Sequence, residues 1–98
     1  MPMLFEWDRD KAKANLRKHK VGFDEAQTVF ADDFSIAIPD PDHSDKEVRL
    51  IIIGMSNRHR LLVVIYTERG KRLRLISART ATRQERERYE NQELASFG

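Results

Sequence analysis

The sequence predicts an α+β domain in which N-terminal helices pack on an antiparallel sheet of about four strands, with a charged helix at the C-terminal end. Two observations predict this fold. Apolar residues recur with a helical period in the first third of the chain, and from Phe34 onward they follow a strand-like period. The 98 residues contain no internal repeat, so we expect one domain over residues 1–98.

A helix is predicted near the start of the chain, after a short strand over residues 4–7. Asp8 is a residue type that caps helices, and residues 9–19 place Ala12 and Leu16 on one side with lysines and arginines on the other. We therefore expect Ala12 and Leu16 to face the core.

A second, short helix is predicted to begin at Asp24. Gln27 follows Asp24 three residues later, which resembles a capping box, and the apolar Ala26, Val29 and Phe30 come with it. This segment is expected to complete the helical part that covers the sheet.

Four segments rich in Ile, Val and Leu predict the strands. They cover residues 34–38, 48–54, 60–68 and 71–78. The last three are separated by short turn sequences, which favours an antiparallel meander. The loop 39–46 has two prolines and several charges and is expected to be exposed.

The last helix is predicted from a second capping box, formed by Thr82 and Glu85. The helix 82–94 offers only Tyr89 and Leu94 as sizeable apolar groups, which is little to hold it on a core. It either docks through Tyr89 or binds a partner.

Charge is distributed unevenly along the chain. Residues 32–47 contain six carboxylates and one lysine, a net charge of −5, whereas residues 49–88 contain eleven Lys or Arg and three Glu, a net charge of +8. This layout indicates a polyanion as partner for the basic segment. A solvated charged face is the alternative.

Several classes of function have no support in the sequence. The chain has no cysteine, which excludes disulfides, thiolate zinc sites and cysteine nucleophiles. It has no nucleotide-binding or serine-hydrolase motif, and Asp40, Asp42, His43 and Asp45 lack calcium-loop spacing, so we expect no metal and no cofactor. No run is apolar enough to span a membrane, so we expect a soluble, cytoplasmic protein.

Charged residues alternate with apolar residues in the predicted strands. Regular alternation puts Glu47 and Arg49 on one face of their strand. In the last strand it puts Arg72 and Arg74 on one face and Ser77 on the other. These cations predict either an anion-binding face or cross-strand salt bridges. His19, at a helix end, is suited to proton transfer, with a structural capping role as the alternative.

Three stretches together resemble the BrnT family of toxins from bacterial type II toxin-antitoxin pairs. They are FEWDRDKAKANLRKHKVGFDEA, EVRLIIIG and RLRLISARTATRQERERYE, which contain a W-D-x-x-K-x-x-x-N-x-x-K-H opening and an I-S-A-R-x-A-x-x-x-E closing. The chain departs from the family at Lys20, where the family usually has glycine, and this adds a cation.

The resemblance implies a RelE-like ribonuclease toxin that inhibits translation by cutting RNA. It also implies a cognate antitoxin of BrnA type, through which the complex would bind operator DNA. The motif positions imply a functional set consisting of Trp7, Lys18, His19, Glu47, Arg49, Arg69 and Arg79.

RNA cleavage needs no metal when protein groups move the protons and stabilise the charge. We expect Glu47 or His19 as the base, Lys18 or His19 as the acid, and arginines on the phosphate. Lys11, Arg74 and Arg83 are expected to contact the RNA backbone, and Trp7 to stack on a base or lie in the core. The alternative function is a basic binding module without turnover, for nucleic acid or protein.

Overall fold

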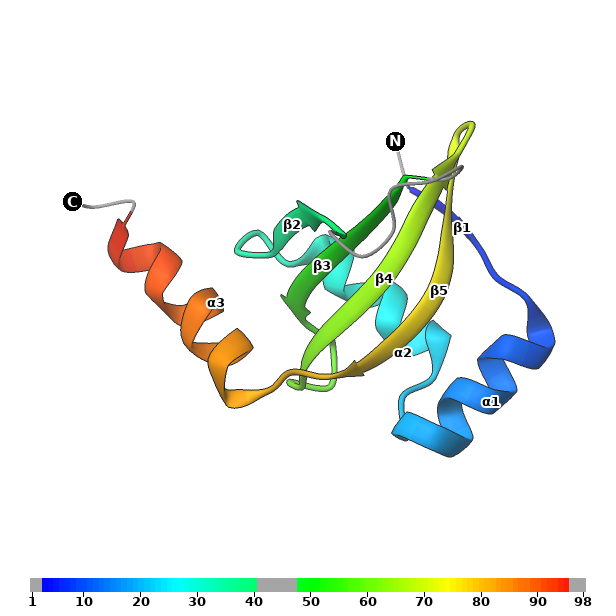
Figure 1. Cartoon of the computed structure of the whole chain (residues 1–98), viewed down its shortest axis with the longest axis horizontal. Coiled ribbons are helices and arrows are strands. Elements are labelled where there is room, and N and C mark those ends of the chain that lie inside the picture. The colour runs from blue at the N-terminus through cyan, green and yellow to red at the C-terminus, as the bar shows by residue number, and fades with distance from the viewer. Residues whose placement is uncertain (1–2, 41–47, 96–98) are drawn as a thin grey trace.

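The computed structural model describes residues 3–40 and 48–95. Within these residues, one five-stranded sheet has the order β1-β5-β4-β3-β2. The elements are β1 (Leu4–Glu6), α1 (Arg9–His19), α2 (Phe23–Ala26), the 3-10 helix η1 (Gln27–Ala31), β2 (Ile36–Pro39), β3 (Arg49–Met55), β4 (Leu61–Arg69), β5 (Arg72–Thr80) and α3 (Arg83–Ala95). Figure 1 shows α2 across one face of the sheet, α1 beyond β5, and α3 on the opposite side beyond β2.

The α+β class is confirmed, but the prediction of about four antiparallel strands is wrong. The described sheet has five strands and is mixed, because β1 pairs in parallel with β5 from Leu4↔Arg72 to Glu6↔Arg74. The cause is core packing between distant segments: Phe5 of β1 contacts Phe30, with ring centroids 5.1 Å apart. Apolar periodicity identified β1 as a strand but carried no information on its partner.

Helix α1 begins where its cap predicts. Asp8 accepts a hydrogen bond from the Lys11 backbone N–H at 2.9 Å. The helix ends with Lys20 in the left-handed region at φ 60°, the position at which glycine is usually favoured. Leu16, expected in the core, is 54% exposed, and Asn15 is the buried residue at 6%. The reason is that α1 packs against the edge of β5 and not over the sheet face.

The second helix starts differently from the prediction. Helix α2 begins at Phe23 after Gly22, which makes no side-chain capping bond, so Asp24 is not the cap. Asp24 lies in the first turn, where its charge still favours the helix dipole. The buried Phe23 ring belongs to the core, and this packing places the helix start before Asp24.

The main core lies between the sheet and the α2–η1 segment. Its buried residues are Val21, Phe23, Ala26, Val29, Ile52, Leu62, Val64, Tyr66, Leu75 and Ala78. A smaller cluster of Ile53, Leu61 and Val63 lies on the other face, in contact with Ala81 and Tyr89. Among the described residues, no helix combines the length and apolar composition needed to cross a membrane.

A β-bulge in β5 changes which side chains share a face. Ile65 pairs with Ser77, but the next residue, Tyr66, pairs with Leu75, so Ile76 is an extra residue in β5. Ser77 therefore lies on the same face as Arg74, and the predicted separation of these two residues is wrong. Regular alternation failed because the inserted residue shifts every later side chain to the opposite face.

Candidate active site and nucleic-acid interface

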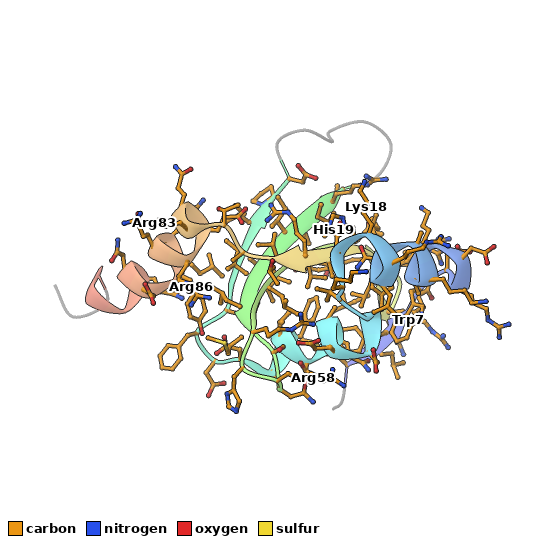
Figure 2. All side chains as sticks on the ribbon, turned by 90° about the horizontal axis from the view of Figure 1, so that it is seen from below. Trp7, Lys18, His19, Arg58, Arg83 and Arg86 are labelled. Carbon is orange, nitrogen blue, oxygen red and sulfur yellow. The ribbon has the colours of Figure 1, made fainter. Side chains whose placement is uncertain are left out.

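A pocket of about 210 Å³ lies between α1 and the edge of β5. Its lining residues are Lys11, Ala14, Asn15, Lys18, His19, Ile76 and Ser77. The side chains from α1 meet there because positions three and four residues apart share one side of a helix. Figure 2 shows Lys18 and His19 beside each other next to β5. Three of the residues predicted for RNA, Lys11, Lys18 and His19, thus come together.

The sheet face opposite α2 carries a group of arginines. Arg49 of β3 and Arg74 of β5 are both register partners of Thr67, so they lie on one face on either side of it. Arg79 lies on this same face because of the bulge, and it pairs with Val63. Thr67 lies four positions after Val63 in β4, which places Arg79 about 13 Å along the strand from Arg74.

Arg79 is held by Glu85 on the first turn of α3. Its two terminal nitrogens Nη1 and Nη2 each donate to one carboxylate oxygen, both at 2.8 Å. The hydrogen bond from Arg79 lowers the pKa of Glu85 to about 2, and the Thr82 backbone N–H donating to the same carboxylate contributes. The same pair raises the pKa of Arg79. Glu85 also completes the predicted capping box, since its N–H donates to Thr82 Oγ1.

Arg74 is paired as well. Its Nη1 donates to Glu6 Oε2 at 2.9 Å, which joins β5 to the parallel strand β1. Two of the predicted RNA-binding arginines therefore have carboxylate partners inside the molecule. For Arg74 the alternative of salt bridges across strands describes the observed contact. The partner of Arg79 lies on α3, so that pair joins a strand to a helix.

Other predicted site residues lie apart from the pocket. Arg83, on α3, has a side chain that is 93% exposed and pairs with Glu87. Arg69 lies at the end of β4, where it pairs with Arg72 across the hairpin. The predicted residues that the structure describes thus occupy several places and do not share one pocket. Glu47 lies outside the described residues, as do Asp42, His43 and Asp45.

Trp7 is partly buried and packs against the main core. Its ring packs edge-on against Phe23, with centroids 6.0 Å apart and an interplanar angle of 78°. Figure 2 shows Trp7 toward the side of α2, away from Lys18 and His19. Of the two roles open to this residue, the core role is the one for which the structure shows contacts.

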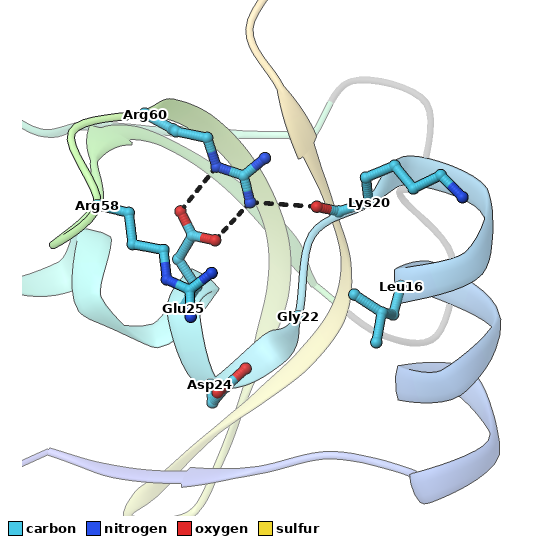
Figure 3. Close-up of a pocket in the computed structure, with 7 residues that line it drawn as sticks. All are labelled: Leu16, Lys20, Gly22, Asp24, Glu25, Arg58 and Arg60. Carbon is cyan, nitrogen blue, oxygen red and sulfur yellow. Dashed lines mark hydrogen bonds and ion pairs between the residues drawn. The ribbon is translucent and has the colours of Figure 1, made fainter.

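A second pocket, of about 220 Å³, contains an ion pair that the sequence patterns did not indicate. Figure 3 shows Arg60 bound to both carboxylate oxygens of Glu25 and to the main-chain oxygen of Lys20. The hydrogen bond from Arg60 lowers the pKa of Glu25 although burial opposes this. The contact fixes the end of α1 to the β3–β4 turn. No short motif links residues 35 positions apart, so only the fold reveals this pair.

Asn15 is the other residue that sequence reasoning left without a role. Its Nδ2 donates to the main-chain oxygens of Val21 and Ala78, and its Oδ1 accepts from the Ala78 N–H. The signal in the sequence was a helix-disfavoured asparagine at the centre of the opening motif.

The fold and the site define a small α+β protein whose first helix and open sheet face carry lysines, arginines and a histidine. The chain belongs to the BrnT family, since the family model described as "Ribonuclease toxin, BrnT, of type II toxin-antitoxin system" matches residues 7–85. This confirms the resemblance given by the motifs. The proteins of this family are ribonuclease toxins of type II toxin-antitoxin systems.

A solved structure supports the same relationship. The crystal structure of the Brucella abortus ribonuclease toxin BrnT is similar to this chain with a TM-score of 0.61 and 28% sequence identity. The match covers 84% of this chain and 100% of the Brucella chain. No curated protein matches the sequence.

Proposed function

We propose that the chain is the toxin of a type II toxin-antitoxin pair and acts as an endoribonuclease that needs neither a metal ion nor a cofactor. Family membership supports the reaction class. The observation that carries the catalytic assignment is the pocket in which Lys18 and His19 lie against Ser77 of β5.

RNA contains its own nucleophile. The ribose 2′-hydroxyl can attack the adjacent phosphate when a base removes its proton and an acid protonates the leaving 5′-oxygen. Either Glu47 or His19 is the base, and either Lys18 or His19 is the acid. A lysine and a histidine on adjacent positions of one helical turn bring a cation and a titratable ring to the same phosphate.

The arginines on the open sheet face bind phosphate in this proposal. Glu85 uses one N–H on each terminal nitrogen of Arg79, and a guanidinium has five N–H donors. The Nε edge of Arg79 is therefore left for a phosphate oxygen, and Arg49 supplies a second guanidinium. Arg69 contacts the RNA at the β4 end.

Three cations hold the RNA backbone outside the reacting phosphate. These are Lys11 in the α1 pocket, Arg74 on the sheet face and Arg83 on α3. Arg83 acts only on a long substrate, because Figure 1 shows α1 and α3 on opposite sides of the sheet. Trp7 belongs to the set that the family motif implies, but its packing on Phe23 favours a structural contribution.

The biological role follows from the family. RNA cleavage would inhibit translation in the cytoplasm, and an antitoxin of BrnA type would neutralise the toxin and bind operator DNA as part of the complex. The relation of the fold to RelE belongs to the same proposal.

The decisive experiment incubates the purified protein with RNA in EDTA and looks for fragments. Cleavage that survives the chelator, and falls to a small but measurable residual rate in Lys18→Ala and His19→Ala, is the expected result. Intact RNA with a gel shift would instead indicate a binding module without turnover. Inducible expression with and without the adjacent gene tests neutralisation.

A further inference from the structure

Asn15 replaces a strand partner for β5. Within the described part of the chain, the parallel strand β1 pairs with β5 only at Arg72, Leu73 and Arg74. Further along the strand, Asn15 exchanges two hydrogen bonds with Ala78, one with its N–H at 3.0 Å and one with its main-chain oxygen at 2.8 Å. The side-chain amide thus satisfies both backbone groups of one strand residue, as a neighbouring strand would.

These two bonds fix the position of α1 along β5. A shift by one strand residue would move the helix about 3.3 Å and break both contacts. The third bond, from Asn15 to the Val21 main-chain oxygen at 2.9 Å, ties the same side chain to the segment after the helix. Asn15 is 6% exposed, so water cannot replace these partners.

The contact lies between residues of the candidate site. On α1, Lys18 and His19 follow Asn15 by three and four residues and share its side of the helix. On β5, Ser77 and Arg79 flank Ala78, and both point away from the main core. The contact between Asn15 and Ala78 therefore sets how the α1 cations face the arginine on the sheet.

We infer that Asn15 is a positioning residue, which holds Lys18 and His19 in register with Ser77 and Arg79 for work on one RNA phosphate. The inference rests on the proposed function. It differs from a purely structural role in one respect: the effect of Asn15 on RNA must pass through the α1 groups and disappear when they are absent.

A double-mutant cycle tests this. Asn15→Ala, His19→Ala and the double variant are compared for cleavage of a short RNA at a temperature where all remain folded. Asn15→Ala is expected to lower kcat about tenfold or more, because small misplacements of catalytic groups are costly. In the His19→Ala background the same change is expected to have less than about a threefold effect.

Val29→Ala is the matched control, since Val29 is fully buried and lies in η1, outside the pocket. It should lower the melting temperature and leave kcat within about twofold. Equal effects of Asn15→Ala in both backgrounds, or an equal loss of kcat in Val29→Ala, would overturn the inference.

A binding measurement distinguishes a failure of this inference from a failure of the proposed function. The cycle is repeated with Lys18→Ala, measuring affinity for an RNA whose 2′-oxygens are methylated and which cannot be cleaved. Coupling between Asn15 and Lys18 in binding, with no cleavage by the unaltered protein, would reject the nuclease and keep the positioning role. Additive effects in binding together with active cleavage would reject the positioning role alone, and no binding and no cleavage would reject both.

Discussion

Arg79 of β5 and Glu85 of α3 form a two-point ion pair, with both nitrogen–oxygen distances at 2.8 Å. The pair joins the proposed phosphate-binding arginine to the cap of the C-terminal helix, because Glu85 also bonds Thr82. The stability of α3 and the geometry of the candidate site are therefore linked through one carboxylate.

The first prediction concerns acid stability. Arg79 lowers the pKa of Glu85 from 4.5 to about 2 in the folded protein. Because the folded value is the lower one, the pair stabilises the fold above about pH 4.5, and this contribution is lost as the pH falls toward about 2. We expect about 1–2 kcal/mol, reduced by partial exposure, and a smaller loss of unfolding free energy on acidification in Glu85→Gln.

Urea unfolding at neutral and acidic pH measures this difference. Glu87→Gln is the control, because Glu87 forms only an exposed pair with Arg83 on the same helix. The same acid dependence in all three proteins would show that the Arg79 pair contributes nothing.

The second prediction concerns catalysis. Arg79→Ala is expected to reduce RNA cleavage about a hundredfold or more, on the order of 3 kcal/mol, because it removes a cation from the charged transition state. Arg79→Lys keeps the positive charge but loses the bidentate guanidinium. Its cleavage rate should lie between those of the unaltered protein and Arg79→Ala. Single-turnover cleavage and growth arrest on expression are the measurements. Unchanged cleavage and growth arrest in Arg79→Ala would contradict the assignment.

The third prediction concerns the end of α1. Lys20 has φ 60° and ψ 30°, a region that costs a residue with a Cβ atom about 1 kcal/mol. Lys20→Gly should therefore raise the unfolding free energy by about 1 kcal/mol. Lys20→Ala is the control, since it removes the charge and retains the backbone strain. A gain of similar size in both variants would mean that charge, and not backbone conformation, is responsible.

The fourth prediction concerns the attachment of α3. The Tyr89 hydroxyl donates to Asp32 Oδ2 at 2.5 Å, and the Gln92 side chain donates to the Phe34 main-chain oxygen. Tyr89→Phe should cost about 1 kcal/mol and speed amide exchange in α3.

The pKa of Asp32 gives a second measure of the hydrogen bond from Tyr89. Burial raises the pKa of Asp32, but the bonds from Tyr89 and from the Met55 and Phe34 N–H groups bring it below 3.8. In Tyr89→Phe the pKa of Asp32 should rise, as measured by NMR titration. An unshifted Asp32 and unchanged exchange would show that α3 is held elsewhere.

The fifth prediction concerns RNA affinity. Lys11→Gln should weaken binding and lower the slope of log affinity against log salt by about one, because one phosphate contact is removed. Arg58→Gln is the matched control, since Figure 2 shows Arg58 on the side of α2, away from Lys18 and His19. A smaller salt slope in Arg58→Gln than in Lys11→Gln would mean that RNA binds on the side of α2, which would contradict the prediction.

Local signals predicted much of the secondary structure. The caps at Asp8 and Thr82 form as expected, because each requires only residues within one helical turn. The capping box at Asp24 does not form, because the burial of Phe23 starts the helix earlier. Local chemistry is thus a reliable guide where no tertiary contact competes with it.

The sequence predicted which residues belong to the candidate site, but it predicted their arrangement in space less well. The motifs identified Lys18, His19 and Arg79, and the structure brings the first two together in one pocket. The face on which Arg79 lies follows from the bulge at Ile76, and a bulge has no signature in the alternation of apolar residues. The carboxylate partners Glu6 and Glu85 also required the structure.

The sequence by itself determined the approximate positions of most helices and strands, the basic character of the second half, and the family. These properties depend on neighbouring residues and on composition. The tertiary structure alone decided which cations are paired, which share a face, and that Asn15 bonds Ala78 across 63 positions. The reason is that strand register and ion pairing depend on the packing of segments far apart in the chain, which no local pattern encodes.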